Sequence, residues 1–192
     1  MIILCVARGH NGSTTLMVDG EIVFYLEEER LSRFKYDGSP MLGILKAFEY
    51  VDHIDHLVVC HTHRSGPNLD WTGEHMYEGF VRKIARKKWE FETTYIDLNH
   101  HEMHAACGFY NSGFEEADVV VVDGLGNFFD EEHHECATRW HIKKPAEIKL
   151  LERQGASRFG TKTDRHGYWP MGIGMAYASI SCLLYTSPSP RD

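Results

Sequence analysis

The sequence predicts an α/β protein built from two related lobes. Short apolar segments typical of strands alternate with segments whose apolar residues recur at helical spacing. In addition, the order strand, glycine loop, strand, turn, strand occurs twice, at residues 2–26 and 119–152, with little identity between the two copies. A duplicated unit of this kind would bring two glycine loops face to face, as a nucleotide or phosphate cleft requires.

The first copy begins with the apolar segment 2–7, which is followed by a polar loop and two further strands. Segments 14–18 and 21–26 are strand-like, and the Asp19-Gly20 pair between them is a strong signal for a two-residue hairpin turn. After a charged segment, apolar residues at helical spacing over 41–51 predict a helix. Residues 57–60 are typical of a buried central strand.

The basic stretch 82–88 is interpreted as a solvated helix face or as a surface that binds phosphate or a partner. Residues 95–97 are strand-like, and 100–113 have the alanines, aromatic pair and Asn-Ser-Gly stop of a helix. The valines 119–122 predict a fully buried strand that ends at a D-G-L-G loop. Strands at 136–142 and 147–152 are expected to follow.

We therefore expect a first lobe at residues 1–115 and the start of a second lobe at 116–181. A small-residue helix over 171–178 runs into Ser-Pro-Ser-Pro, which breaks any regular element. Residues 182–192 are interpreted as a non-native or disordered tail, which would make the chain an N-terminal fragment.

Composition excludes several classes of protein. The chain has 192 residues, of which 25% are charged and 43% hydrophobic, and a formal net charge of −8. The values are those of a globular protein, and the acidic balance disfavours nucleic acid as a partner. No apolar run approaches the ~18 residues of a membrane span. Because the sequence has no such run and its first ten residues lack the features of a signal peptide, we expect a cytoplasmic protein with no membrane partner. In such a protein, five cysteines without C-x-x-C spacing predict free thiols in or near the core.

Histidines carry the strongest chemical signal. His100 and His104 are four residues apart, so on a helix both imidazoles could bind one metal ion. Two zinc-protease patterns fail by one position, at Ala105 and at Met103. Surface histidines or a capped helix start are the alternative interpretation. Segment 130–135 is interpreted as a solvated hairpin tip or a second metal site.

Asp123 ends the valine strand, where α/β proteins commonly bind ligands, although a turn residue that bonds its own backbone would look the same. In the first loop, Asn11, Gly12 and Ser13 are expected to leave backbone N–H groups free for an anion. His10 in that loop could act as a general base or stabilise charge.

Together these segments resemble the N-terminal domain of the O-carbamoyltransferase family. The resemblance lies in GHNGSTTLMVDGEIVFYLEEERLSRFKYDG, in HHEMHAACGFYNSGFEEADVVVVDGLG and, more weakly, in MGIGMAYASIS, and it covers most of residues 2–180. It implies a two-lobed actin/hexokinase-like domain of duplicated RNase H-like lobes, with the second lobe incomplete.

The resemblance also implies the chemistry. A divalent metal, commonly iron but with zinc or manganese as alternatives, would be bound by His100, His104 and Asp123, and His10 would be catalytic. Loop residues, including Gly124 and Gly126, would hold phosphate. ATP and carbamoyl phosphate would be co-substrates, converted to carbamoyl adenylate by a C-terminal YrdC-like domain that this chain lacks. The acceptor would be a hydroxyl group of a small molecule, a sugar or an antibiotic-like compound.

Because that domain and the last metal-binding aspartate are expected beyond residue 180, we expect the 192-residue chain by itself to be inactive. Two other hypotheses remain open. One is a kinase of the same fold, in which the paired histidines would be idle. The other is a non-catalytic module in which His100 and His104 hold a structural metal ion.

Overall fold

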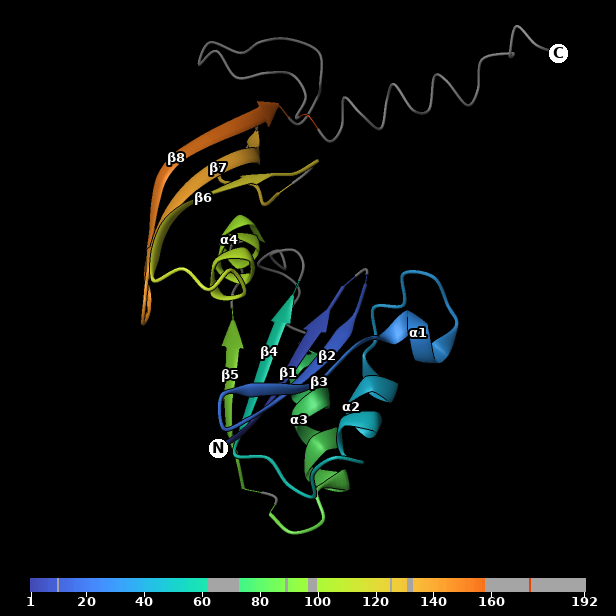
Figure 1. Cartoon of the computed structure of the whole chain (residues 1–192). Coiled ribbons are helices and arrows are strands. Elements are labelled where there is room, and N and C mark those ends of the chain that lie inside the picture. The colour runs from blue at the N-terminus through green and yellow to red at the C-terminus, as the bar shows by residue number, and fades with distance from the viewer. Residues whose placement is uncertain are drawn as a thin grey trace, which may run out of the picture. The chain divides into compact units, whose positions relative to one another are not determined.

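A computed structural model describes residues 1–9, 11–61, 73–88, 90–96, 100–124, 126–130, 133–157 and 173 of the chain. The chain divides into two compact units, Met1–Leu98 and Asn99–Asp192 (Figure 1). The first unit contains a mixed sheet with helices and the second an antiparallel sheet, which confirms the α/β class. The sequence placed the lobe boundary after residue 115, and the relation between the two units as duplicated lobes stays a prediction.

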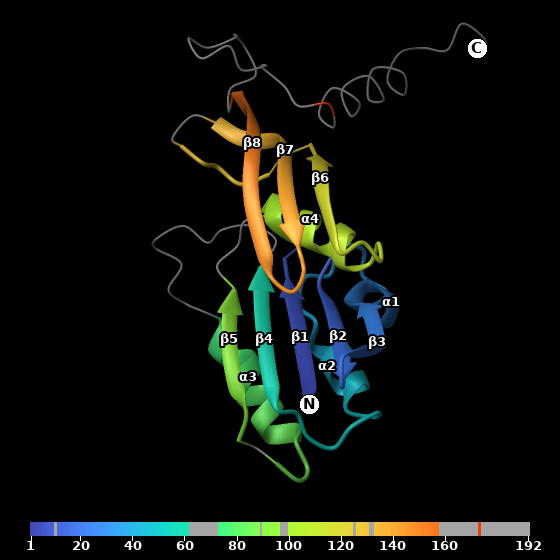
Figure 2. The ribbon, with the colours of Figure 1, turned by 60° about the vertical axis from the view of Figure 1, so that its left-hand side comes forward.

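The first unit is organised around a five-stranded sheet with the order β3-β2-β1-β4-β5. Strands β1, β4 and β5 run parallel, whereas β2 is antiparallel to both of its neighbours (Figure 2). Each strand agrees with a predicted strand to within a few residues. The bounds are Ile2–Arg8 for β1, Ser13–Val18 for β2, Glu21–Glu27 for β3, His56–His61 for β4 and Glu92–Ile96 for β5.

The β2–β3 turn confirms the local hairpin signal. Val18 pairs with Glu21, so Asp19 and Gly20 alone make the turn. Their φ angles are +50° and +92°, the left-handed values that a tight hairpin turn needs and that Asp-Gly adopts readily.

One face of this sheet carries the core of the first unit. Helices α2 (Met41–Ala47) and α3 (Gly73–Ile84) both contribute to it, through Ile44 and Val81 respectively. The strands contribute fully buried residues such as Leu4, Leu16 and Leu57. Their burial on one face of each strand produces the apolar alternation visible in the sequence.

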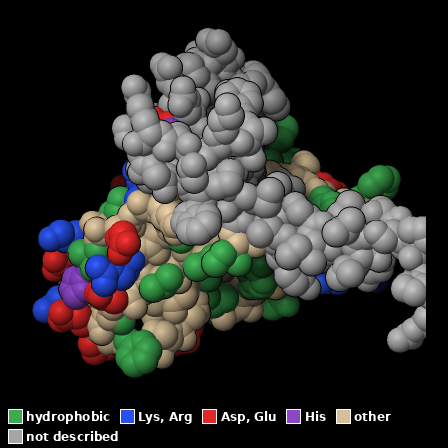
Figure 3. All heavy atoms as spheres, turned by 90° about the horizontal axis from the view of Figure 1, so that it is seen from above, with side chains coloured by type: hydrophobic (Ala, Val, Ile, Leu, Met, Phe, Trp, Pro, Cys, Tyr) green, Lys and Arg blue, Asp and Glu red, His purple; other side chains and the backbone are tan. Residues whose placement is uncertain are grey.

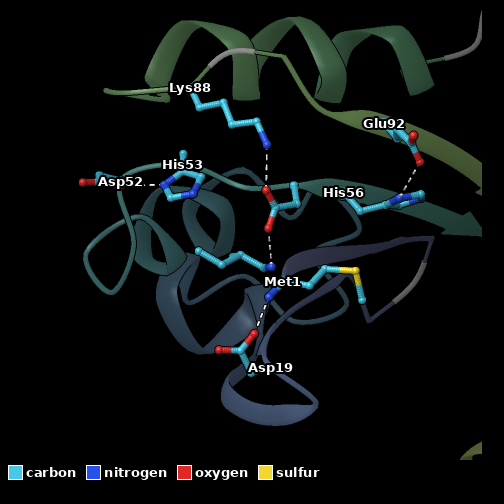
Figure 4. A network of polar contacts seen from close by, with 9 residues as sticks. Met1, Asp19, Asp52, His53, His56, Lys88 and Glu92 are labelled. Atoms are coloured by element: carbon cyan, nitrogen blue, oxygen red, sulfur yellow. Dashed lines mark hydrogen bonds and ion pairs between the residues drawn. The ribbon is translucent and has the colours of Figure 1, made fainter.

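A short helix, α1 (Glu28–Ser32), was not predicted, because its charged residues carry no apolar periodicity. The basic stretch was predicted as helical throughout, but α3 ends at Ile84. Beyond that point Lys87 pairs with Asp52. Lys88 pairs with Asp55 at 2.7 Å, in the polar network shown in Figure 4. These ion pairs fit the solvated-surface interpretation of the stretch.

The second unit packs one helix on a three-stranded antiparallel sheet with the order β6-β7-β8. Its core joins Ala105 and Phe109 of the helix to Val121, Trp140 and Ile142 of the sheet. The bounds are His100–Tyr110 for α4, Glu116–Val122 for β6, His133–Lys143 for β7 and Glu147–Ser157 for β8.

The prediction of a fully buried valine strand was wrong. Val121 is buried, but Val120 and Val122 are 67% and 51% exposed. Within the described residues α4 packs on one face of the sheet, so the valines alternate between core and surface.

The other face of this sheet carries charged side chains beside the exposed Val120 and Val122. Glu116 pairs with Lys143 at 2.8 Å, and His141 contacts Asp118 at 2.9 Å. Acidic, basic and histidine side chains lie side by side in the surface view of Figure 3.

Among the described residues, no helix has the length and apolar character needed to cross a membrane. Four described cysteines, Cys5, Cys60, Cys107 and Cys136, are free, as predicted, although Cys107 is exposed rather than near the core. The predicted helix over 171–178 and the tail 182–192 lie outside the described residues, apart from Ile173.

Candidate metal centre

Helix α4 presents His100 and His104 on one face. Their Nε2 atoms lie 3.1 Å apart, as expected for residues one helical turn apart. The His100 side chain is 12% exposed and that of His104 is 55% exposed, so the pair lies at the edge of the helix–sheet core.

Asp123, directly after β6, completes the cluster. Its Oδ2 atom lies 2.7 Å from Nε2 of His100 and 3.9 Å from Nε2 of His104. Its Oδ1 atom accepts the N–H of Gly124 at 2.6 Å, so both interpretations of this aspartate hold together: it bonds its own turn and faces the histidines. All three candidate ligand atoms lie within 4.8 Å of one another, and this is the one such cluster found within the described residues.

The local electrostatics favour the protonation states that metal ligands require. Burial by itself would raise the pKa of Asp123, but the hydrogen bonds from His100 and from the Gly124 amide outweigh burial and lower it. Burial, together with the neighbouring His100, lowers the pKa of His104. An ionised carboxylate and a neutral imidazole are the forms that bind a metal ion.

In the first glycine loop the amide of Gly12 is engaged, whereas the sequence led us to expect it to be free for an anion. The N–H of Gly12 donates to the carbonyl of Asp37 at 2.9 Å, and that of Gly9 to the carbonyl of Gly38 at 3.4 Å. Gly12 is buried against this segment, and Ser13 already belongs to β2. Asn11 lies in the turn with a φ of +66°, and His10 lies outside the described residues. Anion binding by this loop stays a prediction.

Two buried carboxylates hold the segment that engages this loop. Glu28 is 2% exposed and accepts the N–H groups of Leu42 and Gly43 at 2.9 Å each, at the start of α2. Glu29 accepts a hydrogen bond from Lys35 at 2.9 Å and another from the Tyr36 amide at 3.1 Å. The charged segment after β3 is therefore structural.

In the second glycine loop the amides of Gly124 and Gly126 are also engaged. Gly124 donates to Asp123, and Gly126 donates to the carbonyl of Glu135 at 2.8 Å. The structure therefore does not show these amides free to hold phosphate, and that role of Gly124 and Gly126 stays a prediction. Leu125 lies outside the described residues.

Sequence reasoning missed a buried polar group beside the cluster. His101 is fully buried, and burial lowers its pKa to about 4. Glu135 is 1% exposed, lies 3.0 Å from Nε of Arg153, and has its pKa raised by burial. The burial of His101 could have been predicted from the consecutive histidines at the start of an alanine-rich helix, because one of the two must face the sheet. The Glu135–Arg153 pair joins the neighbouring strands β7 and β8, so no pattern in the local sequence predicts it.

Two imidazole nitrogens and one carboxylate oxygen suit a first-row divalent metal such as iron, zinc or manganese. The donor set by itself does not choose among them. For the second candidate site, at 130–135, the structure shows His133 bonded to Asp130 at 2.8 Å, while Glu135 faces Arg153.

Comparison with known proteins places the chain among longer relatives. No family model matches it. It is 25% identical to the uncharacterized protein sll1178 of Synechocystis over 85% of this chain and 32% of that protein. It is 29% identical to the nodulation protein NolNO of Sinorhizobium fredii over 62% of this chain and 20% of that protein. It is 30% identical to the uncharacterized protein MJ1051 of Methanocaldococcus jannaschii over 66% of this chain and 23% of that protein.

Among solved structures, YeaZ from Pseudomonas aeruginosa aligns with 84% of this chain and 72% of its own, at a TM-score of 0.43 and 11% identity. The chain thus spans about a fifth to a third of the length of the curated relatives it matches, and one of these is a nodulation protein.

Proposed function

We propose that the chain is part of an O-carbamoyltransferase, which transfers a carbamoyl group from carbamoyl phosphate to a hydroxyl group through carbamoyl adenylate. The observation that carries the proposal is the convergence of His100, His104 and Asp123, which all lie in the segment 100–126 that resembles this family. The similarity to the nodulation protein NolNO over 62% of the chain supports it.

In this proposal the chain's own residues hold the metal and position the reactants. His100 and His104 offer imidazole lone pairs, and Asp123 offers a carboxylate oxygen whose orientation is held by the Gly124 amide. A bound divalent metal, iron in our proposal, would act as a Lewis acid toward the phosphate or carbonyl oxygen of the donor. His10 would accept the proton of the attacking hydroxyl.

The remaining parts of the reaction are assigned to the region of the relatives that this chain does not span. We place there the YrdC-like domain, which would use ATP and carbamoyl phosphate, and the rest of an actin/hexokinase-like second lobe. The acceptor in this proposal is a small molecule, and the location is cytoplasmic, where free thiols such as those described here persist.

The first test measures metal binding by the purified chain. We expect one Co²⁺ per chain, with loss of binding in His100→Ala and His104→Ala. His141→Ala is the matched control, because His141 also contacts a carboxylate of the second unit but lies on the other face of the sheet. Equal binding by all three variants would refute the site.

The second test uses the product of the source gene read beyond the codon for Ser181. We expect carbamoylation of a hydroxyl acceptor that requires both ATP and carbamoyl phosphate and is lost in His10→Ala and His100→Ala. Phosphorylation of the acceptor from ATP alone would favour a kinase instead. Unfolding on metal removal, without binding of any acyl donor, would favour a structural metal site.

A further inference from the structure

His101, the histidine between the two candidate ligands, has a place in the structure that metal binding does not explain. Its residue is fully buried on the side of α4 that faces the sheet. The Nδ1 atom lies 3.0 Å from Oγ1 of Thr138, which also accepts the indole N–H of Trp140 at 2.7 Å. Because the indole can only donate, the threonine hydroxyl hydrogen is available to be donated to Nδ1 of His101.

The Nε2 edge of the ring meets the backbone of Gly126. A Cβ atom added to Gly126 would lie 2.7 Å from Nε2 and 2.8 Å from Cδ2 of His101, distances that real Cβ atoms do not show. The same atom would lie 2.8 Å from Cβ of Glu135. Nε2 is buried and has no hydrogen-bond partner among the described residues, so it serves as a contact surface for the loop.

The opposite side of the loop is tied to β7. The amides of Asp123 and Gly126 donate to the carbonyls of Cys136 and Glu135, at 3.1 and 2.8 Å, and the Glu135 amide donates to the carbonyl of Asn127 at 2.9 Å. The loop is thus held between the strand and the imidazole ring. Asp123 belongs to this loop and His100 to α4, so the thickness of the ring contributes to the separation between the helix and the carboxylate.

We propose that His101 is a positioning residue: its ring, held by Thr138 and packed against Gly126, sets the distance between Asp123 and the two histidines of the metal centre. The inference rests on the proposed metal site. It also explains why position 126 is a glycine. Any side chain there would collide with the His101 ring, so the glycine is needed for this contact rather than for anion binding.

The test is a double-mutant cycle read out by Co²⁺ binding to the full chain. His101→Ala removes the ring, and Gly126→Ala pushes the loop away from it. Each change is expected to weaken Co²⁺ binding by about 10- to 100-fold, the usual effect of altering residues that orient metal ligands. It should also shift the visible absorption bands of the bound ion.

The double variant should bind Co²⁺ more tightly than Gly126→Ala alone, because the added methyl group enters the space that the ring leaves. Ile142→Val is the control for a general loss of stability, since Ile142 is fully buried in the same core and does not belong to the loop or to the cluster. If His101→Ala does not fold, Gly126→Ala and the control still decide the question.

Unchanged Co²⁺ affinity and absorption bands in folded Gly126→Ala would overturn the inference, as would additive effects in the double variant. Failure of the unmutated chain to bind Co²⁺ would refute the metal site itself, so the two failures are distinguishable.

Discussion

Removal of the Glu28 carboxylate should destabilise the first unit more than its position in a charged segment suggests. Glu28 is 2% exposed, and its two oxygens accept the amides of Leu42 and Gly43. Its own amide donates to the carbonyl of Gly12 at 2.7 Å, so the residue joins the first glycine loop to the start of α2. The Glu28→Ala variant leaves both amides of α2 without their acceptor.

The magnitude follows from the burial of the two amides. The bond to Gly43 is buried, and a hydrogen bond to a charged group contributes about 1.5–3 kcal/mol. Leu42 is 42% exposed, so water can replace the carboxylate there and the loss is only about 0.5–1 kcal/mol. We expect Glu28→Ala to cost about 2–4 kcal/mol, and Glu28→Gln about half as much because one acceptor oxygen remains.

Hydrogen exchange followed by mass spectrometry is the suitable assay, because it reports on each compact unit separately. The expected loss corresponds to about 30- to 700-fold faster exchange of the most protected amides of β1 and β4. Exchange in β6–β8 should not change. Glu49→Ala is the matched control: this carboxylate follows α2, is 62% exposed, and should contribute less than about 0.5 kcal/mol. Equal exchange in the two alanine variants would refute the capping role of Glu28.

Three further predictions test the other parts of the molecule. Asp123→Asn should weaken Co²⁺ binding by more than the ~100-fold reached by residues that only orient ligands, as measured by competition with a chelator. Gly12→Ala places a Cβ atom 2.8 Å from the backbone carbon of Gly38, and should cost about 1–3 kcal/mol in chemical unfolding; an unchanged midpoint would show that the two segments separate easily. Asp55 has its pKa lowered from 3.8 to about 2, chiefly by Lys88, so its ionised form stabilises the folded state above about pH 4, and this contribution is lost as the pH falls through 2. Asp55→Asn should therefore lower the unfolding temperature at pH 6, and the difference from the unmutated chain should close toward pH 2.

Part of the candidate site was predictable because its signals are local. His100 and His104 share a helix face through their spacing alone, and the alanines around them favour the helix. Asp123 was placed at the end of a strand by the valines before it. That Asp123 reaches His100 at 2.7 Å is a property of the packed unit, since it depends on how α4 lies on the sheet.

The expectation of a free loop amide was wrong for Gly12, for a related reason. The composition of the first loop favours a turn, but the partners of its amides, Asp37 and Gly38, come from a segment beyond β3. No pattern within the loop reveals whether another part of the chain will occupy its donors. The same holds for Glu28, whose burial depends on the approach of α2.

The sequence by itself determined the strands, the hairpin turn at Asp19-Gly20 and the face shared by two histidines, because backbone preference and side-chain periodicity act over a few residues. The tertiary structure decided which valines of β6 are buried, which loop amides are engaged, and that His101 lies against Gly126. Those outcomes depend on contacts between segments far apart in the chain, and such contacts are set by the packing of whole helices and strands rather than by any local pattern.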